Sequence, residues 1–155
     1  MAPNAVRFVA VLFAALALAP TLAHLMELPH KIGLDAQAYL TVQQIYRGWS
    51  LLGIVVAVAL LSSLALAVMV RGRRREFVPA LIGFLCVAAT QAVFWSFTFP
   101  VNQATVNWTI LPANWMALRA QWEYSHALSA LFNLAALVAL ICCVLARKDS
   151  AFALR

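Results

Sequence analysis

The sequence predicts an all-α integral membrane protein built as a four-helix bundle, and its composition and charge spacing carry that prediction. Of its 155 residues, 65% are hydrophobic and only 10% are charged, whereas about 25% of residues are charged in an ordinary soluble domain. Uncharged stretches of 19, 23, 42 and 23 residues separate the charged positions. Since a helix needs about 20 mostly apolar residues to span a bilayer, we expect one domain over residues 1–155 that contacts lipid.

The predicted spans are about residues 8–26, 40–70, 79–99 and 115–146. The first contains Pro20, and a secretory signal peptide is its alternative interpretation. The second is expected to belong to one helix over 36–70, with Asp35 as its N-cap. Pro79 suits the first turn of the third helix, and Pro100 is expected to end it. Together with Pro112, Pro100 divides the longest uncharged stretch into two spans and a loop.

The basic residues predict the orientation of the bundle. An even number of spans places eight of them on one face, namely Arg7, Arg71, Arg73, Arg74, Arg75, Arg147, Lys148 and Arg155. Three fall on the other face, namely Lys31, Arg47 and Arg119. Because basic loops stay in the cytoplasm, this predicts an N-in/C-in protein of a bacterial inner membrane. The net charge of +6 is explained by these loops, so we expect no nucleic-acid partner.

Polar residues within the spans gather near the outer face. His24 and Glu27 are three residues apart in the first span, and Glu123 and His126 are three apart in the fourth. At about 1.5 Å per residue, both histidines lie about 25–31 Å from the basic flank of their own span. The opposite halves of the spans contain almost only apolar residues. We therefore expect the two imidazoles and two carboxylates to meet near the outer leaflet.

This pattern favours a metal or catalytic site. Helical bundles that bind iron or manganese use the Glu-x-x-His spacing, and nitrogen and oxygen ligands suit Fe, Mn, Cu or Zn. The predicted metal ligands are His24, Glu27, Glu123 and His126. Either glutamate is also a candidate catalytic base, with Arg47 orienting a carboxylate. Structural polar packing and passage of protons or substrate across the membrane remain open as alternatives.

Aromatic and amide side chains also accumulate in the outer halves of the spans and in the outer loop. We expect a hydrophobic substrate cavity to be lined by Trp95, Asn102, Asn107, Trp108 and Trp122. The alternative for the tryptophans is an aromatic belt at the membrane interface.

Five segments resemble a known family. They are HLMELP from His24, YLTVQQIYRG from Tyr39, FTFPVN from Phe97, Asn107-Trp108, and WEYSH from Trp122. They are similar to a small four-span membrane family that includes the fungal anthrone oxygenases, and are closest to its bacterial branch. The resemblance implies a four-helix membrane bundle with a polar site near the outer leaflet. Its motif positions carry over as candidates to His24, Glu27, Asn102, Asn107, Glu123 and His126.

The leading functional hypothesis is therefore a membrane-embedded, oxygenase-like oxidoreductase, with a transition metal as its predicted cofactor. Its substrate would be a lipophilic or aromatic small molecule. The alternative is a non-enzymatic membrane subunit or scaffold whose polar end docks a partner. A homo-oligomer is compatible with either hypothesis.

Overall fold

The computed structural model describes residues 4–152, with side chains described over 4–146. Its elements are α1 (Asn4–Lys31), α2 (Ala36–Gln43), η1 (Gln44–Tyr46), η2 (Trp49–Leu51), α3 (Leu52–Val70), α4 (Arg74–Val93), the π-helical turn η3 (Phe94–Thr98), α5 (Phe99–Ala104) and α6 (Trp115–Phe152). No strand occurs among the described residues, so the predicted all-α fold is confirmed.

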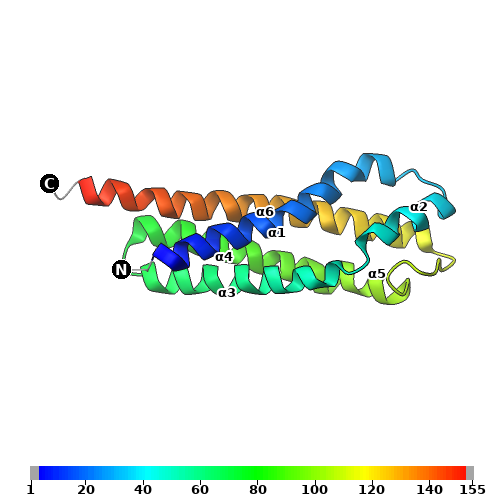
Figure 1. The fold of residues 1–155 in the computed structure, drawn as a ribbon, viewed down its shortest axis with the longest axis horizontal. Coiled ribbons are helices and arrows are strands. Elements are labelled where there is room, and N and C mark those ends of the chain that lie inside the picture. The colour runs from blue at the N-terminus through cyan, green and yellow to red at the C-terminus, as the bar shows by residue number, and fades with distance from the viewer. Residues whose placement is uncertain (1–3, 153–155) are drawn as a thin grey trace.

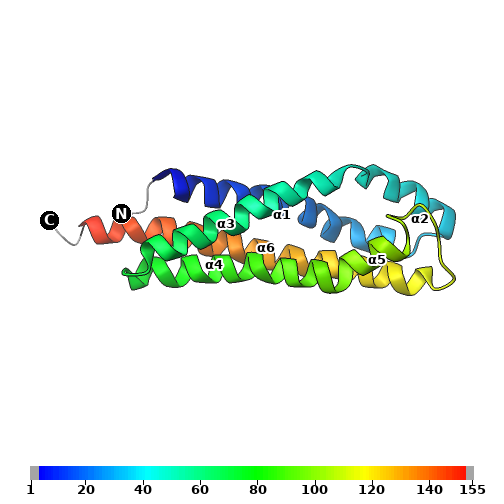
Figure 2. The same ribbon diagram turned by 90° about the horizontal axis from the view of Figure 1, so that it is seen from below.

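Among the described residues, four helical segments are long and apolar enough to cross a membrane: Asn4–Lys31, Trp49–Val70, Arg74–Ala104 and Trp115–Ala146. They lie side by side as an elongated bundle, in which α1 and α4 each pack against α3 and α6 (Figures 1 and 2). The start of α1, the α3–α4 connection and the end of α6 share one end of the bundle, which we call the terminal end. The α2 and α5 helices lie at the opposite end, which we call the α2–α5 end.

The helices approach one another through small side chains. The buried core of the terminal half consists of Ala10, Ala14, Leu66, Ala67, Val70, Ala80, Leu140 and Cys143. Lipid tails are as apolar as leucine, so helices in a bilayer associate by close packing rather than by removing apolar surface from water. Larger side chains such as Leu61 and Ile54 instead point outward, about two-thirds exposed, where they contact lipid.

Gly83 of α4 lies close against α6. A Cβ atom added there would lie 2.7 Å from Cγ of Leu140, which is fully buried. Overpacking of this kind costs about 1–3 kcal/mol, so Gly83→Ala is expected to lower the free energy of unfolding by that amount in mixed micelles. Gly53→Ala is the control, because nothing lies within 4 Å of its added Cβ. Equal stability of the two variants would contradict this packing.

The prediction of one continuous helix over residues 36–70 is wrong. Asp35 caps α2 as expected, accepting a hydrogen bond of 2.9 Å from the backbone N–H of Ala38. The helical path then ends at Arg47, and Gly48 adopts a left-handed φ of 89°. Glycine carries no Cβ and tolerates this conformation at little steric cost. The second span therefore starts at Trp49, and the predicted boundary at residue 40 is nine residues too early.

The third span is longer at both ends than predicted. It begins at Arg74, so Pro79 lies inside α4 rather than in its first turn. Pro100 does not end the helical path, which continues through the π-helical turn η3 and through α5 to Ala104. Pro100 lies in the first turn of α5, directly after the π-helical turn, and its missing backbone N–H leaves one carbonyl of the preceding turn without a helical hydrogen bond.

The terminal half is less uniformly apolar than the sequence suggests. Arg7 on α1 is 4% exposed and forms an ion pair with Glu76 of α4, which is 1% exposed. A second, partly exposed guanidinium, that of Arg73, lies 3.1 Å from the other oxygen of Glu76. Nη1 of Arg7 also donates to the Cys143 carbonyl of α6 at 3.5 Å. The buried guanidinium of Arg7 thus joins three helices, α1, α4 and α6, at this end. The side chains of Arg147 and Lys148, and all of Arg155, lie outside the described residues.

Candidate functional site

Two histidines from distant parts of the chain meet at the α2–α5 end. His24 of α1 and His126 of α6 stack with 4.2 Å between ring centroids and 27° between planes. The Trp122 ring lies against both, 4.9 Å from His24 and 4.3 Å from His126 between centroids. The structure therefore brings together the two imidazoles that the sequence predicted would converge. His24 is 3% exposed, so its ring is shielded from solvent and lipid.

The two glutamates are joined by a lysine that the sequence analysis used only to count charges. Glu123 is fully buried on α6, and its Oε1 lies 3.0 Å from Nζ of Lys31. The same Nζ lies 3.7 Å from Oε2 of Glu27, whose side chain is 35% exposed. The Lys31 side chain is 4% exposed. One buried ammonium group thus faces both carboxylates.

Two tyrosines complete this network. The hydroxyl of Tyr39 donates to Oε1 of Glu123 at 2.9 Å. Nζ of Lys31 donates to the hydroxyl of Tyr46 at 2.8 Å, and that hydroxyl donates to Glu27. We refer to His24, Glu27, Lys31, Tyr39, Tyr46, Glu123 and His126 as the polar cluster.

Both tyrosines remain protonated donors. Burial, and then the neighbouring Glu123 carboxylate, raises the pKa of Tyr39 well above its ordinary value. Burial, and then the hydrogen bond to Glu27, does the same to the pKa of Tyr46. Desolvation and a nearby negative charge both disfavour the phenolate. The two hydroxyls therefore hold the carboxylates by donation throughout the physiological pH range.

Aromatic rings enclose the polar cluster. Nζ of Lys31 lies 4.5 Å from the ring centroid of Tyr46, 5.0 Å from that of Trp122 and 6.0 Å from that of Tyr39. Cations within about 6 Å of an aromatic face are attracted by the ring quadrupole. The centroid of Trp49 lies 5.6 Å from that of His24. Rings from α2, η1, η2 and α6 thus surround charges carried by α1 and α6.

Several buried polar atoms at this end have no hydrogen-bond partner within the described part of the chain: Nδ1 of His24, Oε2 of Glu123, Nε2 of Gln43 and Nε1 of Trp108. Nδ1 of His24 lies 3.8 Å from Oε2 of Glu27, beyond hydrogen-bond distance. Buried polar groups in folded proteins are nearly all paired. Unpaired donors and acceptors around one cluster therefore suit a site that takes up a polar group of another molecule.

The predicted cavity residues separate into two groups. Trp122 and Trp108 are buried, pack on each other with centroids 6.2 Å apart, and lie against the polar cluster. Asn102 accepts a hydrogen bond of 2.8 Å from Nε1 of Trp122. Asn107 is exposed on the α5–α6 loop. Trp95 is 60% exposed and contacts Phe94 and Phe99, so it faces lipid rather than the cluster.

Arg47 also lies apart from the polar cluster. It is exposed, and no carboxylate among the described side chains lies within ion-pair distance of it. Arg119, the other basic residue assigned to this face, donates to the Leu34 carbonyl at 2.6 Å and lies over the rings of Trp115 and Tyr39. The cation that pairs with a carboxylate of the polar cluster is therefore Lys31, and not Arg47 as the sequence analysis predicted.

Sequence reasoning missed three residues of the cluster, although signals for them were present. Lys31 follows Glu27 by four residues and His24 by seven, so all three share one face of a helix. Tyr39 and Tyr46 both fall in the segment YLTVQQIYRG that the sequence analysis singled out. The positions of both tyrosines depend on the break in the helix at Gly48. The predicted continuous helix over residues 36–70 contained no such break.

The arrangement of the predicted metal ligands does not fit a metal ion. The His24 and His126 rings stack face to face instead of directing two nitrogens at one point. The ammonium group of Lys31 lies between the carboxylates, where a metal ion would have to be. Over residues 4–146, no group of three or more His, Cys, Asp or Glu side chains is arranged to hold a metal. Metal binding stays a prediction, and no chemical step below depends on it.

Comparison with known proteins adds no family to this geometry. The chain matches no family model, no curated protein and no solved structure. The class that the fold defines is a multi-pass helical membrane protein, and any narrower assignment depends on the polar cluster itself.

Proposed function

We propose that this chain is a membrane-embedded oxidoreductase that oxygenates a lipophilic, aromatic substrate at the polar cluster. The observation that carries the proposal is the stacked pair His24–His126 beside the buried Lys31–Glu123 ion pair. It places a proton acceptor and a fixed cation next to each other in a region shielded from water. The resemblance to the anthrone oxygenases supports the same class of reaction.

The proposed first step is removal of a proton from an activated C–H bond. His24 has a buried Nδ1 without a hydrogen-bond partner, so it can accept this proton. The rings of His126 and Trp122, packed against it, hold the His24 ring in place. A positioned base of this kind typically contributes about 10²–10⁴-fold to the rate.

Lys31 would stabilise the anion that forms. Loss of the proton delocalises the electron pair of the C–H bond onto a conjugated carbonyl oxygen of the substrate. An ammonium group held by Glu123 and Tyr46 can pair with that oxygen without reorganising. Preorganised charge in a water-poor site is worth more than the same charge in water. The rings of Trp122, Tyr46 and Trp49 suit a flat aromatic substrate lying beside these groups.

Dioxygen is the oxidant in this proposal. When a ring CH₂ becomes C=O, the carbon loses two hydrogens and four electrons. One molecule of dioxygen accepts four electrons, one of its oxygen atoms entering the product and the other leaving as water. Dioxygen and an aromatic substrate both partition into the bilayer. Glu27 and Trp49, each about one-third exposed, would give both molecules access to the polar cluster.

The proposed location is a bacterial inner membrane, with the α2–α5 end outward. The supporting observation is the distribution of basic residues between connections, which favours a cytoplasmic terminal end. In this orientation the polar cluster would lie near the outer leaflet. A homo-oligomer is compatible with it.

The test uses purified protein in detergent, with anthrone as substrate and oxygen uptake as the readout. His24→Ala and His126→Ala are each expected to reduce turnover at least 100-fold. His30→Ala is the matched control, because His30 is an exposed histidine on the same helix. Metal content is measured on the same samples. Stoichiometric metal in the wild type and its loss in both variants would establish the predicted metal centre and contradict the chemistry above.

The alternative function is a scaffold that docks a partner. It is favoured by the apolar side chains of Val106 and Ile110, about half exposed on the α5–α6 loop. Turnover that is absent in the wild type, together with a stable complex that tolerates His24→Ala but not changes in residues 102–115, would replace the enzymatic proposal.

A further inference from the structure

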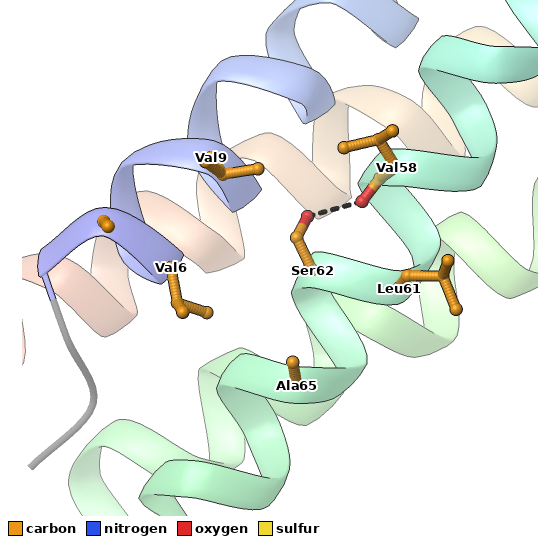
Figure 3. Close-up of a pocket in the computed structure, with 7 residues that line it drawn as sticks. Val6, Val9, Val58, Leu61, Ser62 and Ala65 are labelled. Atoms are coloured by element: carbon orange, nitrogen blue, oxygen red, sulfur yellow. Dashed lines mark hydrogen bonds between the residues drawn. The ribbon is translucent and has the colours of Figure 1, made fainter.

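An open apolar groove runs between α1 and α3 in the terminal half of the bundle, away from the polar cluster. It has a volume of about 380 Å³ and is lined by Ala5, Val6, Val9, Val58, Leu61, Ser62 and Ala65. Figure 3 shows Val6 and Val9 extending from α1 on the side that faces α3. This volume falls within the range of about 300–1,000 Å³ that is common for small-molecule sites.

The walls of this groove are almost entirely apolar. The Ser62 hydroxyl, its one polar side chain, donates to the Val58 carbonyl at 2.6 Å within α3 (Figure 3). The flanking side chains of Leu61 and Phe8 are each about two-thirds exposed and extend outward from the helices. Along α3, the groove extends from Val58 to Ala65, about 10 Å at the helical rise. Its shape and chemistry fit a segment of a hydrocarbon chain.

Unpaired positive charge lies just beyond the groove. Arg71 follows Ala65 by six residues, about 9 Å along the helix, and the next exposed arginines are Arg74 and Arg75. Within the side chains that the structure describes, none of these three makes an ion pair. The nearby carboxylate, Glu76, is buried and already paired with Arg7 and Arg73. Arginine binds phosphate oxygens in a bidentate manner.

We propose that this region binds an anionic phospholipid. One acyl chain occupies the groove between α1 and α3, and the phosphate is held by Arg71 of the α3–α4 connection together with Arg74 and Arg75 at the start of α4. Complementary charge selects this occupant over a neutral lipid. A second copy of the chain would bring the same positive charge to the same place. The proposal does not depend on the function of the polar cluster.

The experiment measures lipid retention by native mass spectrometry of detergent-purified protein. The probes are phosphatidylglycerol and phosphatidylcholine with identical acyl chains. Wild type is expected to retain phosphatidylglycerol preferentially. An arginine near an anionic lipid surface contributes about fivefold in affinity, so Arg71→Gln with Arg74→Gln is expected to weaken phosphatidylglycerol binding about thirtyfold. Arg47→Gln, an exposed arginine at the other end, is the charge control.

Ala65→Leu and Ser62→Leu fill the groove without changing charge, and each is expected to abolish the preference. Ala135→Leu adds the same bulk to an exposed position on α6 and should leave it intact. Circular dichroism and the elution volume in size-exclusion chromatography identify any variant that fails to fold. If one groove variant fails to fold, the lipid preference of the other groove variant tests the proposal. Equal retention of both lipids by wild type would overturn the proposal. A dimer that Ala65→Leu dissociates would assign the groove to self-association and would also overturn it.

Discussion

Replacing Lys31 with methionine is expected to lower the free energy of unfolding by about 3–5 kcal/mol, the usual cost of removing one partner of a buried ion pair. Methionine keeps most of the volume of the side chain, but Glu123 then remains fully buried without its cation. Its Tyr39 partner supplies one hydrogen bond and no charge. The measurement is equilibrium unfolding in mixed micelles.

A second substitution separates charge from packing in this prediction. In Lys31→Met combined with Glu123→Gln, the buried charge is gone and a side-chain oxygen can still accept from Tyr39. We expect the double variant to be more stable than Lys31→Met alone, with a coupling energy above about 1 kcal/mol. Arg47→Met, an exposed cation at the same end, should change stability by less than about 0.5 kcal/mol. Simple additivity of the two substitutions would show that Lys31 does not stabilise the protein through its ion pair with Glu123.

The second large effect is expected at the terminal end. Arg7→Met leaves Glu76 buried with one remaining cation, that of Arg73. The Arg73 guanidinium is partly exposed, so it compensates the buried charge of Glu76 incompletely. We therefore expect Arg7→Met to lower the free energy of unfolding by about 3 kcal/mol, which is at the lower end of the range for a broken buried ion pair.

Arg73→Gln provides the comparison for Arg7→Met. Its side chain is 37% exposed, so the pair with Glu76 is screened by solvent and is worth about 1 kcal/mol or less. The two variants remove the same formal charge from the same carboxylate, and they differ in burial. If they destabilised the protein equally, the burial of Arg7 would not be what stabilises this end of the bundle.

The helices were predictable because lipid imposes a simple rule on the chain. A segment that crosses hydrocarbon must satisfy its backbone internally, so long apolar stretches become helices whatever their neighbours. The prediction was wrong where this rule stops, at the membrane edge. There Gly48 adopts a left-handed conformation just before Trp49. Water or side chains can form the hydrogen bonds that the backbone loses at such a break. No apolar pattern distinguishes a helix that continues there from one that breaks.

The site was predictable in its residue types and not in its pairings. The spacing of His24 with Glu27 and of Glu123 with His126 fixed which helix face each pair occupies. The relative rotation of α1 and α6 decided the rest. It brought the imidazoles into a stack and placed Lys31 beside Glu123. The pair of Arg7 with Glu76 was missed for a related reason, since counting basic residues by face treats each as a loop charge.

The π-helical turn at Phe94–Thr98 gives α4 and α5 a different register from that of an uninterrupted helix. A π turn accommodates one residue more than an α turn, and one residue corresponds to about 100° of rotation. Removing that single residue would turn the Asn102 side chain away from the indole of Trp122. The Trp122 ring in turn packs against both His24 and His126. The orientation of the Trp122 ring thus depends on one extra residue in a different helix, about one turn before the Asn102 amide that accepts its hydrogen bond.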